Sequence, residues 1–359
     1  MKIAFFTNKP YDKCETFIKA QIDRLPFDIV HYWGNNLPFN VGNNDSIVVK
    51  TFKKLKLIKR DNSTRLHKEL QKNKVKVVVA QYGMIGAKLL LVCKELSLPL
   101  VVHFHGHDAV RKSVLEAYKA SYKAMFNYEK VVVISVSKEM TKRLMQIGCP
   151  KEKIVYNPYG PNPDFLNLEL NYLKPQFIGV GRFVEKKAPH LTILAFYKVL
   201  KKHPEAKLVL AGTGVLLDSC KDLVEALEIQ HNVFFAGQIT PLEYQKYITE
   251  SLAFVQHSIK AQDNDMEGTP VAILEAGGAG LPVISTSHAG IPDVILNNET
   301  GLLCVEKDIV QMAENMIWML DNKQQAMEMG KKGKLRVSEL FSMDRYISNL
   351  SVAITSISK

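Results

Sequence analysis

The chain has 359 residues, of which 47% are hydrophobic and 23% are charged, a composition typical of soluble globular proteins. This length exceeds what one compact core usually supports, so we expect two domains. No apolar run approaches the ~20 residues of a membrane span, and the start, MKIAFFTNKPYDK, predicts a buried strand rather than a signal peptide. The five cysteines form no CxxC pair, which favours reduced thiols over disulfides or a zinc site.

The net charge of +11 is concentrated in the N-terminal half. Residues 1–172 contain 28 Lys and Arg against 15 Asp and Glu, whereas residues 173–359 contain 19 against 21. The densest basic segment, KTFKKLKLIKR, runs from Lys50 to Arg60. Two interpretations stay open for it: contact with an anionic membrane surface, at about 1 kcal/mol per basic residue, or a solvated basic surface. Nucleic acid is not favoured, because no nucleic-acid motif accompanies the charge.

Short β-branched segments alternate with longer segments of helical spacing along the whole chain. Strands are expected at residues 2–7, 28–33, 46–50, 76–81, 100–105, 130–134 and 153–157, and then at 176–181, 207–211, 232–236, 253–257, 282–286 and 302–305. Such alternation, with nearly continuous apolar strands, indicates parallel sheets covered by helices on both faces. We therefore predict an α/β fold with doubly wound, Rossmann-like sheets.

The alternation breaks once, in a proline-containing segment at residues 158–175 that is typical of a linker. We predict one domain over residues 1–165 and a second over residues 176–342. Residues 343–359 have helical spacing and are expected to pack back across to the first domain. Ligands of such sheets bind beyond the carboxyl ends of the strands, so the predicted site lies between the two domains.

The run EGTPVAILE, residues 267–275, carries the most informative chemistry. Thr269 is expected to cap a helix that has Pro270 at its first position, runs from Val271 to about Ala279 and is ended by glycines. The free N–H groups of that helix start suit a diphosphate. Glu267 precedes the helix, and Glu275 lies five residues beyond Pro270, about 7.5 Å along its axis. The run therefore predicts a site for a sugar–diphosphate–ribose ligand, while two solvated acids around a capped helix remain the alternative.

Three blocks of sequence resemble glycosyltransferase family 4, whose members are retaining enzymes of GT-B fold. The first is EGTPVAILEA with the following GLPVISTSHAGIPDVI. VGRFVEKKAPHLTILAF, at residues 180–196, resembles the donor-phosphate loop of the family, and VHFHGHDA, at residues 102–109, resembles its acceptor-side loop. The likeness covers essentially the whole chain and is greatest to members that build exopolysaccharide, colanic-acid-type chains or lipopolysaccharide. It implies that residues 1–165 bind the acceptor and residues 176–342 bind the nucleotide sugar.

The resemblance also implies roles for individual residues. Arg182 and Lys187 would hold the donor diphosphate and stabilise the charge that grows on it during transfer. Glu275 would bind the ribose hydroxyls. The transferred sugar and the phosphate would be held by Glu267 together with the backbone of Gly268, Thr269 and Pro270. The loop at residues 237–240, which begins with Gly237 and Gln238, would hold the base.

Three histidines alternate in VHFHGHDA: His103, His105 and His107. A continuous strand would place all three on one face, where they could hold a metal ion, but Gly106 is expected to end the strand before the third. The resemblance implies that His105 contacts the transferred sugar and that Asp108 orients the acceptor or this histidine. It also implies that transfer needs no metal. His103 is expected to be a satisfied core histidine.

Together these features predict a retaining, metal-independent glycosyltransferase of the hexosyltransferase type. The expected donor is a nucleoside-diphosphate sugar, with UDP or GDP favoured, and the expected acceptor is a glycan or a lipid-linked sugar in surface polysaccharide biosynthesis. The predicted location is cytoplasmic, with peripheral binding to the inner face of the cytoplasmic membrane as a hypothesis. A nucleotide-sugar epimerase and a non-catalytic, membrane-bound nucleotide-sugar scaffold remain alternatives. A dinucleotide oxidoreductase is disfavoured, because the GTG at residues 212–214 lacks the third glycine of GxGxxG.

Overall fold

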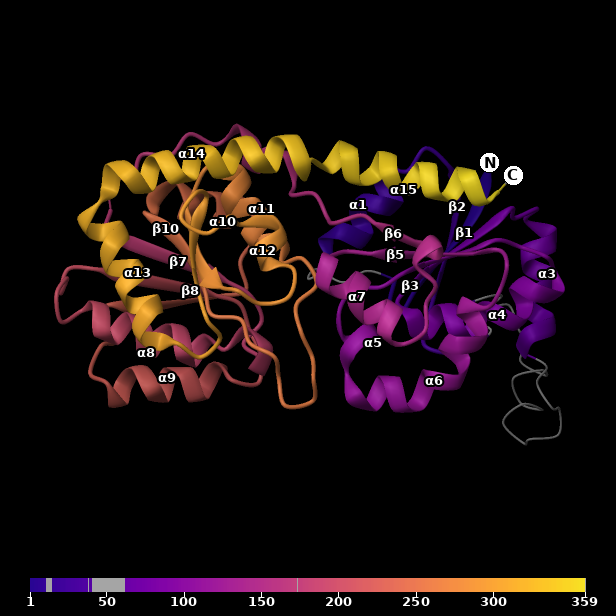
Figure 1. Ribbon diagram of the computed structural model, residues 1–359, viewed down its shortest axis with the longest axis horizontal. Coiled ribbons are helices and arrows are strands. Elements are labelled where there is room, and N and C mark those ends of the chain that lie inside the picture. Colours follow the sequence, from indigo (N-terminus) through magenta and orange to yellow (C-terminus); the bar gives the residue numbers. More distant parts are fainter. Residues whose placement is uncertain (11–14, 38, 41–61, 173, 359) are drawn as a thin grey trace, which may run out of the picture.

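The computed structural model describes residues 1–10, 15–37, 39–40, 62–172 and 174–358. Two six-stranded sheets lie next to each other along the longest axis of the molecule (Figure 1). Every strand pairing within them is parallel. The predicted α/β class with two parallel sheets is therefore confirmed.

The first sheet has the strand order β2-β1-β3-β4-β5-β6. Its strands are β1 (Lys2–Thr7), β2 (Asp28–Trp33), β3 (Val77–Gln81), β4 (Leu100–His103), β5 (Val131–Ser135) and β6 (Ile154–Tyr156). The helices around it are α1 (Thr16–Arg24), α3 (Asn62–Lys72), α4 (Gly83–Glu95), α5 (His107–Val110), α6 (Lys112–Phe126) and α7 (Lys138–Gln146), followed by the short 3-10 turns η1 (Lys151–Lys153) and η2 (Pro163–Asn167). β3 and β4 are buried along their whole length, because helices cover both faces of a parallel sheet.

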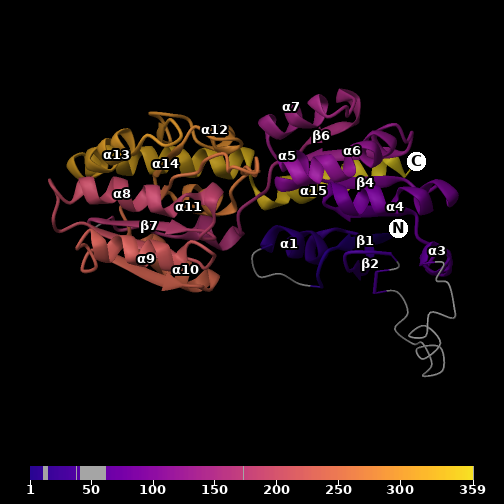
Figure 2. The same cartoon turned by 90° about the horizontal axis from the view of Figure 1, so that it is seen from below.

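The second sheet has the strand order β12-β11-β10-β7-β8-β9. Its strands are β7 (Gln176–Val180), β8 (Lys207–Ala211), β9 (Val233–Gly237), β10 (Ala253–Gln256), β11 (Val283–Thr286) and β12 (Gly301–Cys304). Its other elements are η3 (Glu185–Lys187), α8 (Pro189–Val199), α9 (Leu217–Ala226), α10 (Pro241–Glu250), α11 (Val271–Ala279), α12 (Ile291–Val294), α13 (Ile309–Asp321) and α14 (Lys323–Leu340). Seen from below, β7 lies between α8 and α11 on one side and α9 and α10 on the other (Figure 2).

The strands expected from the sequence are present, within a residue or two of their predicted bounds, wherever the structure describes the chain. The strand expected at residues 46–50 lies outside the described residues, as does the basic segment from Lys50 to Arg60. No helix in the described part of the chain is long and apolar enough to cross a membrane. The described cysteines, Cys93, Cys149, Cys220 and Cys304, are buried free thiols.

The last helix, α15 (Met343–Ile357), follows α14 almost end to end along the upper edge of the molecule and finishes beside the N-terminus (Figure 1). Hydrogen bonds join it to α1 and to the residue that follows β6, both in the first half of the chain. Gln21 Nε2 donates to Tyr346 Oη at 2.6 Å, and Asn157 Nδ2 donates to the Tyr346 carbonyl at 3.0 Å. Gly160 packs so closely here that a Cβ would lie 2.5 Å from Met343 Cα. The C-terminal helix therefore joins the two halves of the chain.

Candidate active site

The loops that follow the strands of the two sheets meet between the halves of the molecule. Thr269, in the loop after β10, donates from its hydroxyl to the Val136 carbonyl after β5. The backbone N–H of Lys112 donates to the Asp263 carbonyl at 3.0 Å. Both contacts join segments beyond the carboxyl ends of parallel strands, which is where ligands of such sheets bind.

Glycines allow the two backbones to approach closely at this junction. A Cβ on Gly268 would lie 2.7 Å from the His105 carbonyl oxygen, too close for any side chain. Gly106 has a φ of +148°, a conformation that L side chains rarely adopt, and a Cβ there would lie 3.2 Å from the Met266 carbonyl oxygen. The loop from the first sheet therefore lies directly against the loop that precedes α11.

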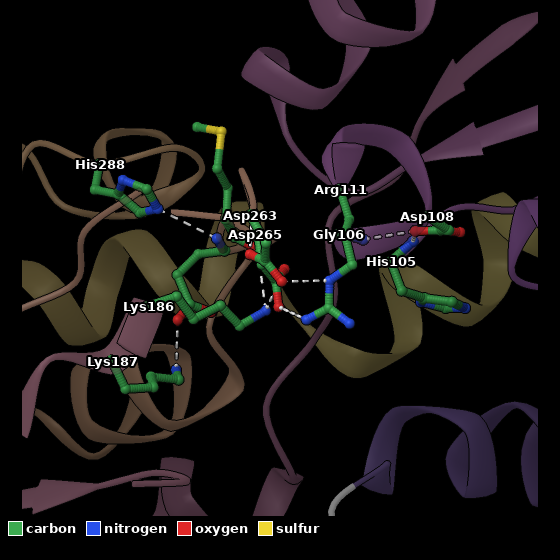
Figure 3. A network of polar contacts seen from close by, with 11 residues as sticks. His105, Gly106, Asp108, Arg111, Lys186, Lys187, Asp263, Asp265 and His288 are labelled. Carbon is green, nitrogen blue, oxygen red and sulfur yellow. Dashed lines mark hydrogen bonds and ion pairs between the residues drawn. The ribbon is translucent and has the colours of Figure 1, made fainter. Parts of the chain in front are cut away.

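Lys187 and Glu267, two of the predicted donor-binding residues, form a buried ion pair. Lys187 Nζ lies 3.1 Å from Glu267 Oε1, and the two side chains are only 15% and 7% exposed. Lys187 Nζ also donates to Gln256 Oε1 at 3.3 Å, at the end of β10. The pair joins the loop after β7 to the loop before α11 (Figure 3).

The ionisation of this pair reflects both burial and mutual attraction. Burial lowers the pKa of Lys187, and attraction by Glu267 opposes that effect only in part. Burial alone would raise the pKa of Glu267, but Lys187, then Lys186 and His288, hold it below its ordinary value. His288 lies next to Glu267, and its Nε2 accepts the Glu267 backbone N–H at 3.2 Å. Glu267 is therefore a carboxylate surrounded by positive charge.

A second lysine, Lys186, completes the arrangement and was not identified in the sequence. Its Nζ donates to Asp265 Oδ1 and to the Met266 carbonyl, both at 3.1 Å, and the residue is 8% exposed. Adjacent lysines on the 3-10 turn η3 thus hold the same loop at different points. The sequence shows the pair of lysines, but not that their side chains take separate acidic partners.

Asp265 also links the two halves of the molecule through Arg111, at the start of α6. Arg111 Nη2 lies 3.0 Å from Asp265 Oδ2, and Arg111 Nε lies 2.9 Å from Asp263 Oδ2 (Figure 3). One guanidinium therefore contacts two carboxylates on the loop before α11, and its Nη2 donates a charge-assisted hydrogen bond to Asp265. Lys186, Asp265 and Arg111 form a continuous charged bridge between the halves.

Arg182 is the exposed cation of the predicted donor site. It follows β7 and has no hydrogen-bond or ion-pair partner for its side chain among the residues that the structure describes. It lines a small pocket together with Lys187 and Gln256. Burial raises the pKa of the Tyr82 phenol in the other half of the molecule, and the charge of Arg182 partly counteracts that rise. An unpaired guanidinium beside a buried ammonium is suited to an anionic ligand.

The start of α11 differs in one respect from the sequence prediction. The helix covers Val271–Ala279, as expected, but its N-cap is Pro270, with no side-chain hydrogen bond to the cap. The prediction that Thr269 is the N-cap was wrong, because its hydroxyl donates across to the Val136 carbonyl instead. The first N–H groups of a helix have no partner within it, so this end of α11 remains suited to a phosphate.

Glu275, the second acid of the E-x7-E pair, faces a different environment from Glu267. Burial raises its pKa to about 8, and a hydrogen bond from the backbone N–H of Asn162 lowers it only in part. Burial of the Tyr244 phenol, on α10, raises the pKa of that group, and the charge of Glu275 raises it further. Around neutral pH this carboxyl therefore retains its proton in much of the population, unless a ligand supplies further hydrogen-bond donors.

His105 lies two residues beyond the end of β4 and is held at both ring nitrogens. Its Nε2 lies 2.8 Å from Gln81 Oε1, and its Nδ1 lies 2.5 Å from Tyr159 Oη. Gln81 Nε2 in turn donates to Gln21 Oε1 at 2.8 Å, which fixes the orientation of the Gln81 amide. Gln81 Oε1 therefore accepts a hydrogen bond from the His105 Nε2–H. Tyr159 then donates to Nδ1. Burial, followed by the charges of neighbouring histidines, lowers the pKa of His105 well below its ordinary value, so the ring is neutral.

Asp108 is fully buried and binds backbone rather than the histidine ring. Its Oδ1 accepts from the N–H groups of His105 at 3.0 Å and Gly106 at 2.9 Å, while its Oδ2 accepts from Gly83 N–H at 3.0 Å. The carboxylate thus shapes the loop that carries His105, which is an indirect way of orienting it. His103 is buried as expected, but it is not fully satisfied: its Nε2 has no hydrogen-bond partner among the described residues.

The predicted base-binding loop begins at the end of β9. Gly237 has a φ of +66°, and nothing lies within 4 Å of a Cβ placed there. Gln238, the next residue, is exposed. A side chain at position 237, four residues before α10, would therefore meet open space. Across the described ranges, no group of three or more His, Cys, Asp or Glu side chains is arranged to hold a metal ion.

Comparison with known proteins identifies the family. The family described as Glycosyltransferase Family 4 matches residues 34–165, and Glycosyl transferases group 1 matches residues 167–336. The chain belongs to this family of glycosyltransferases, as its sequence blocks predicted. The structure of Anabaena HepE in complex with UDP has a TM-score of 0.78, with 13% identity over 99% of this chain and 100% of that one. The predicted GT-B fold is confirmed.

Two curated relatives come from bacterial polysaccharide biosynthesis. The amylovoran biosynthesis glycosyltransferase AmsK of Erwinia amylovora is 32% identical over 243 residues, which are 66% of this chain and 59% of that protein. WcaL of Escherichia coli, named for colanic acid biosynthesis, is 28% identical over 248 residues, 67% of this chain and 60% of that protein. The chain thus spans less than two thirds of the length of these relatives.

Proposed function

We propose that the protein transfers a sugar from a nucleoside-diphosphate sugar to a hydroxyl group, with retention of configuration and without a metal ion. The proposal is supported by Lys187, which pairs with Glu267 in the loop before α11 and lines a pocket together with the unpaired Arg182. Two cations and free helix N–H groups suit a diphosphate leaving group. Glu267 is ionised and suits the hydroxyls of the transferred sugar, and Glu275 suits those of the ribose.

The reaction needs no nucleophile from the protein. The bond between the anomeric carbon and the phosphate oxygen breaks, and the acceptor oxygen forms its bond on the same face of the sugar. The acceptor proton passes to the leaving phosphate oxygen, so a nucleoside diphosphate is released. Arg182 and Lys187 stabilise the charge on that diphosphate, and neutral His105 contacts the sugar from the loop that Asp108 shapes. Contact between the domains limits water at the site.

We infer that the base is uracil or guanine and that the acceptor is a glycan or a lipid-linked sugar of a surface polysaccharide. UDP is supported by the Anabaena HepE structure, which is a complex with that nucleotide, and polysaccharide synthesis by the names of the relatives. The base would lie at Gly237 and Gln238. A lipid-linked acceptor agrees with the excess positive charge of residues 1–172, and we propose that the protein acts at the cytoplasmic face of a membrane through Lys50 to Arg60.

The proposal is tested first by donor binding and then by turnover. A thermal-shift series with UDP-, GDP-, ADP- and dTDP-sugars should show one stabilising base, since a ligand present at about 100 times its Kd adds about 2.7 kcal/mol. The selected donor is then incubated with lipid-linked and free glycan acceptors, with and without EDTA, and the product anomer is read by NMR. An inverted product or loss of activity in EDTA would contradict the mechanism.

Two other outcomes would replace the proposal. Conversion of the donor to another nucleotide sugar without any acceptor would identify an epimerase. Tight donor binding with no turnover on any acceptor would identify a non-catalytic nucleotide-sugar scaffold. Liposome flotation tests the membrane part separately: the wild-type protein should bind anionic vesicles, and neutralising the basic residues from Lys50 to Arg60 should abolish binding.

A further inference from the structure

A groove of about 730 Å³ lies outside the donor site, between α13, α14 and the segment that enters β12. We call it the α13–α14 groove. Figure 1 shows α13 at the end of the second half of the molecule that is furthest from α5 and α6. None of the residues that line it takes part in the site described above. Its volume is within the range of ligand-binding pockets.

The floor of the groove combines an apolar surface with unused hydrogen-bonding groups. Leu302 and Met329 are buried there, and the indole of Trp318 lines it while remaining partly exposed. Asn315 is only 8% exposed. Its Oδ1 accepts from Gln311 Nε2 at 3.1 Å, but its amide nitrogen has no acceptor within the part of the chain that the structure describes. The residue is largely buried, but this nitrogen is not among the buried unpartnered atoms and is therefore open to solvent. An accessible amide donor next to an aromatic ring is suited to a ligand with both apolar and polar faces.

The charge of the rim restricts the class of ligand. Glu299, Glu314 and Glu328 line the groove against one cation, Lys332, and Glu328 already pairs with Lys331 at 2.8 Å. This negative balance contrasts with the net charge of +11 for the chain. Phosphates, nucleotides and acidic glycans would be repelled.

The remaining side chains are suited to hydroxyl groups. Asn and Gln amides both donate and accept hydrogen bonds, and carboxylates accept them from hydroxyls. An indole offers a flat apolar face and one N–H donor. A sugar ring has the matching surface, because its hydroxyls project around the edge while its C–H groups form an apolar face.

We propose that the α13–α14 groove binds an uncharged saccharide segment of the acceptor or product glycan, at a distance from the point of transfer. This inference rests on the proposed function, which supplies the glycan. A glycan that is held at a second point on the protein has a higher effective concentration near the donor site. Long acceptors should therefore bind better than short ones, while the rate of the chemical step stays the same.

Binding to the groove can be measured without any transfer. The chain contains two tryptophans, Trp33 and Trp318, so a Trp33→Phe variant reports on Trp318 alone. Its fluorescence is titrated with maltoheptaose, chitotetraose and a neutral galacto-oligosaccharide to about 10 mM, which covers weak Kd values. An oligogalacturonide serves as the acidic control. We expect a saturable change with at least one neutral sugar and none with the acidic one.

Variants separate the groove from the donor site. Asn315→Leu in the Trp33→Phe background should weaken binding at least about tenfold, which corresponds to about 1.4 kcal/mol. Lys187→Ala should abolish transfer but leave the Trp318 response unchanged. With a long acceptor, Asn315→Leu should raise KM and leave kcat unchanged, while both constants for a short acceptor stay the same.

The proposal is overturned if no neutral sugar changes the fluorescence, if the acidic sugar binds equally well, or if Asn315→Leu has no effect. A protein that competes for Trp318 where no sugar does would also overturn it and would assign the groove to a partner. Saccharide binding in a protein that transfers nothing would contradict the proposed function alone. Transfer without any Trp318 response would contradict the groove alone.

Discussion

Replacing Lys187 with Met is expected to abolish transfer and also to destabilise the second domain. The substitution leaves Glu267 ionised and buried, with only 7% of its side chain exposed. Removing one partner of a buried ion pair typically costs about 3–5 kcal/mol. Lys186 and His288 still attract Glu267, so we expect a loss near the lower end of that range, about 3 kcal/mol.

The double variant distinguishes stability from function. Glu267→Gln removes the charge that Lys187→Met would leave unpaired, so the two changes together should cost less than their sum, by about 1–3 kcal/mol. Activity should not return, because neither the phosphate contact nor the sugar contact is restored. Recovery of stability without recovery of activity is the expected signature of residues that bind the donor directly.

The matched control is Lys202→Met. Lys202 Nζ pairs with Asp321 Oδ2 at 2.6 Å, but the two side chains are 58% and 35% exposed. An exposed pair contributes at most about 1 kcal/mol, so this variant should unfold almost like the wild type and keep full activity. Urea unfolding followed by circular dichroism gives the free energies, and release of nucleoside diphosphate gives the activity.

Two results would refute this reasoning. If Lys187→Met unfolds like Lys202→Met, the ion pair does not stabilise the protein. If Lys187→Met, or a folded Glu267→Ala, retains full activity, these residues do not hold the donor.

Three further predictions concern the junction of the domains and the second acid. Gly268→Ala places a methyl group against the His105 carbonyl oxygen, at 2.7 Å, so we expect a loss of at least about 1 kcal/mol and a clear fall in kcat/KM; normal kinetics would exclude close approach of the loops. Arg111→Ala removes the contacts with Asp263 and Asp265, so small-angle scattering should show a more open molecule. No change is expected for Arg143→Ala, because the side chain of Arg143 pairs, among the described residues, only with those of its own helix, α7. Because the pKa of Glu275 is raised to about 8 from 4.5, the folded state keeps a proton that the unfolded state loses, and stability should fall as pH rises from about 5 to about 8. Donor binding should strengthen over the same range if the carboxylate binds ribose, and Glu275→Gln should flatten both profiles.

The secondary structure could be predicted because its signals are local. Parallel strands buried on both faces appear in the sequence as continuous β-branched runs, such as VVVA before Gln81. The extent of α11 was also predicted correctly, since glycines end it and Pro270 precedes it. The predicted cap was wrong for a tertiary reason: the Thr269 hydroxyl donates to the Val136 carbonyl, which belongs to the other half of the chain. Local capping rules contain no information about such a partner.

The site was predicted as a set of residue types rather than as a network. Arg182, Lys187, Glu267 and Glu275 were identified by spacing and resemblance. Lys186 differs from Lys187 by one position, and only the turn at η3 sends them to different acids. Likewise, the sequence contains no sign that Gln81 and Tyr159 hold the two ring nitrogens of His105, because these residues are 24 and 54 positions away from it.

By itself, the sequence determined the two parallel sheets, the family and the charged residues of the predicted donor site. It could do so because hydrophobic periodicity and motif spacing depend on residues that are close together in the chain. The tertiary structure decided how those charges are paired. It placed Glu267 among cations and left the half-buried Glu275 without one, so two glutamates of the same motif have their pKa values shifted in opposite directions. It also brought Arg111 to Asp263 and Asp265, a contact between distant segments that depends on how the two halves of the chain meet.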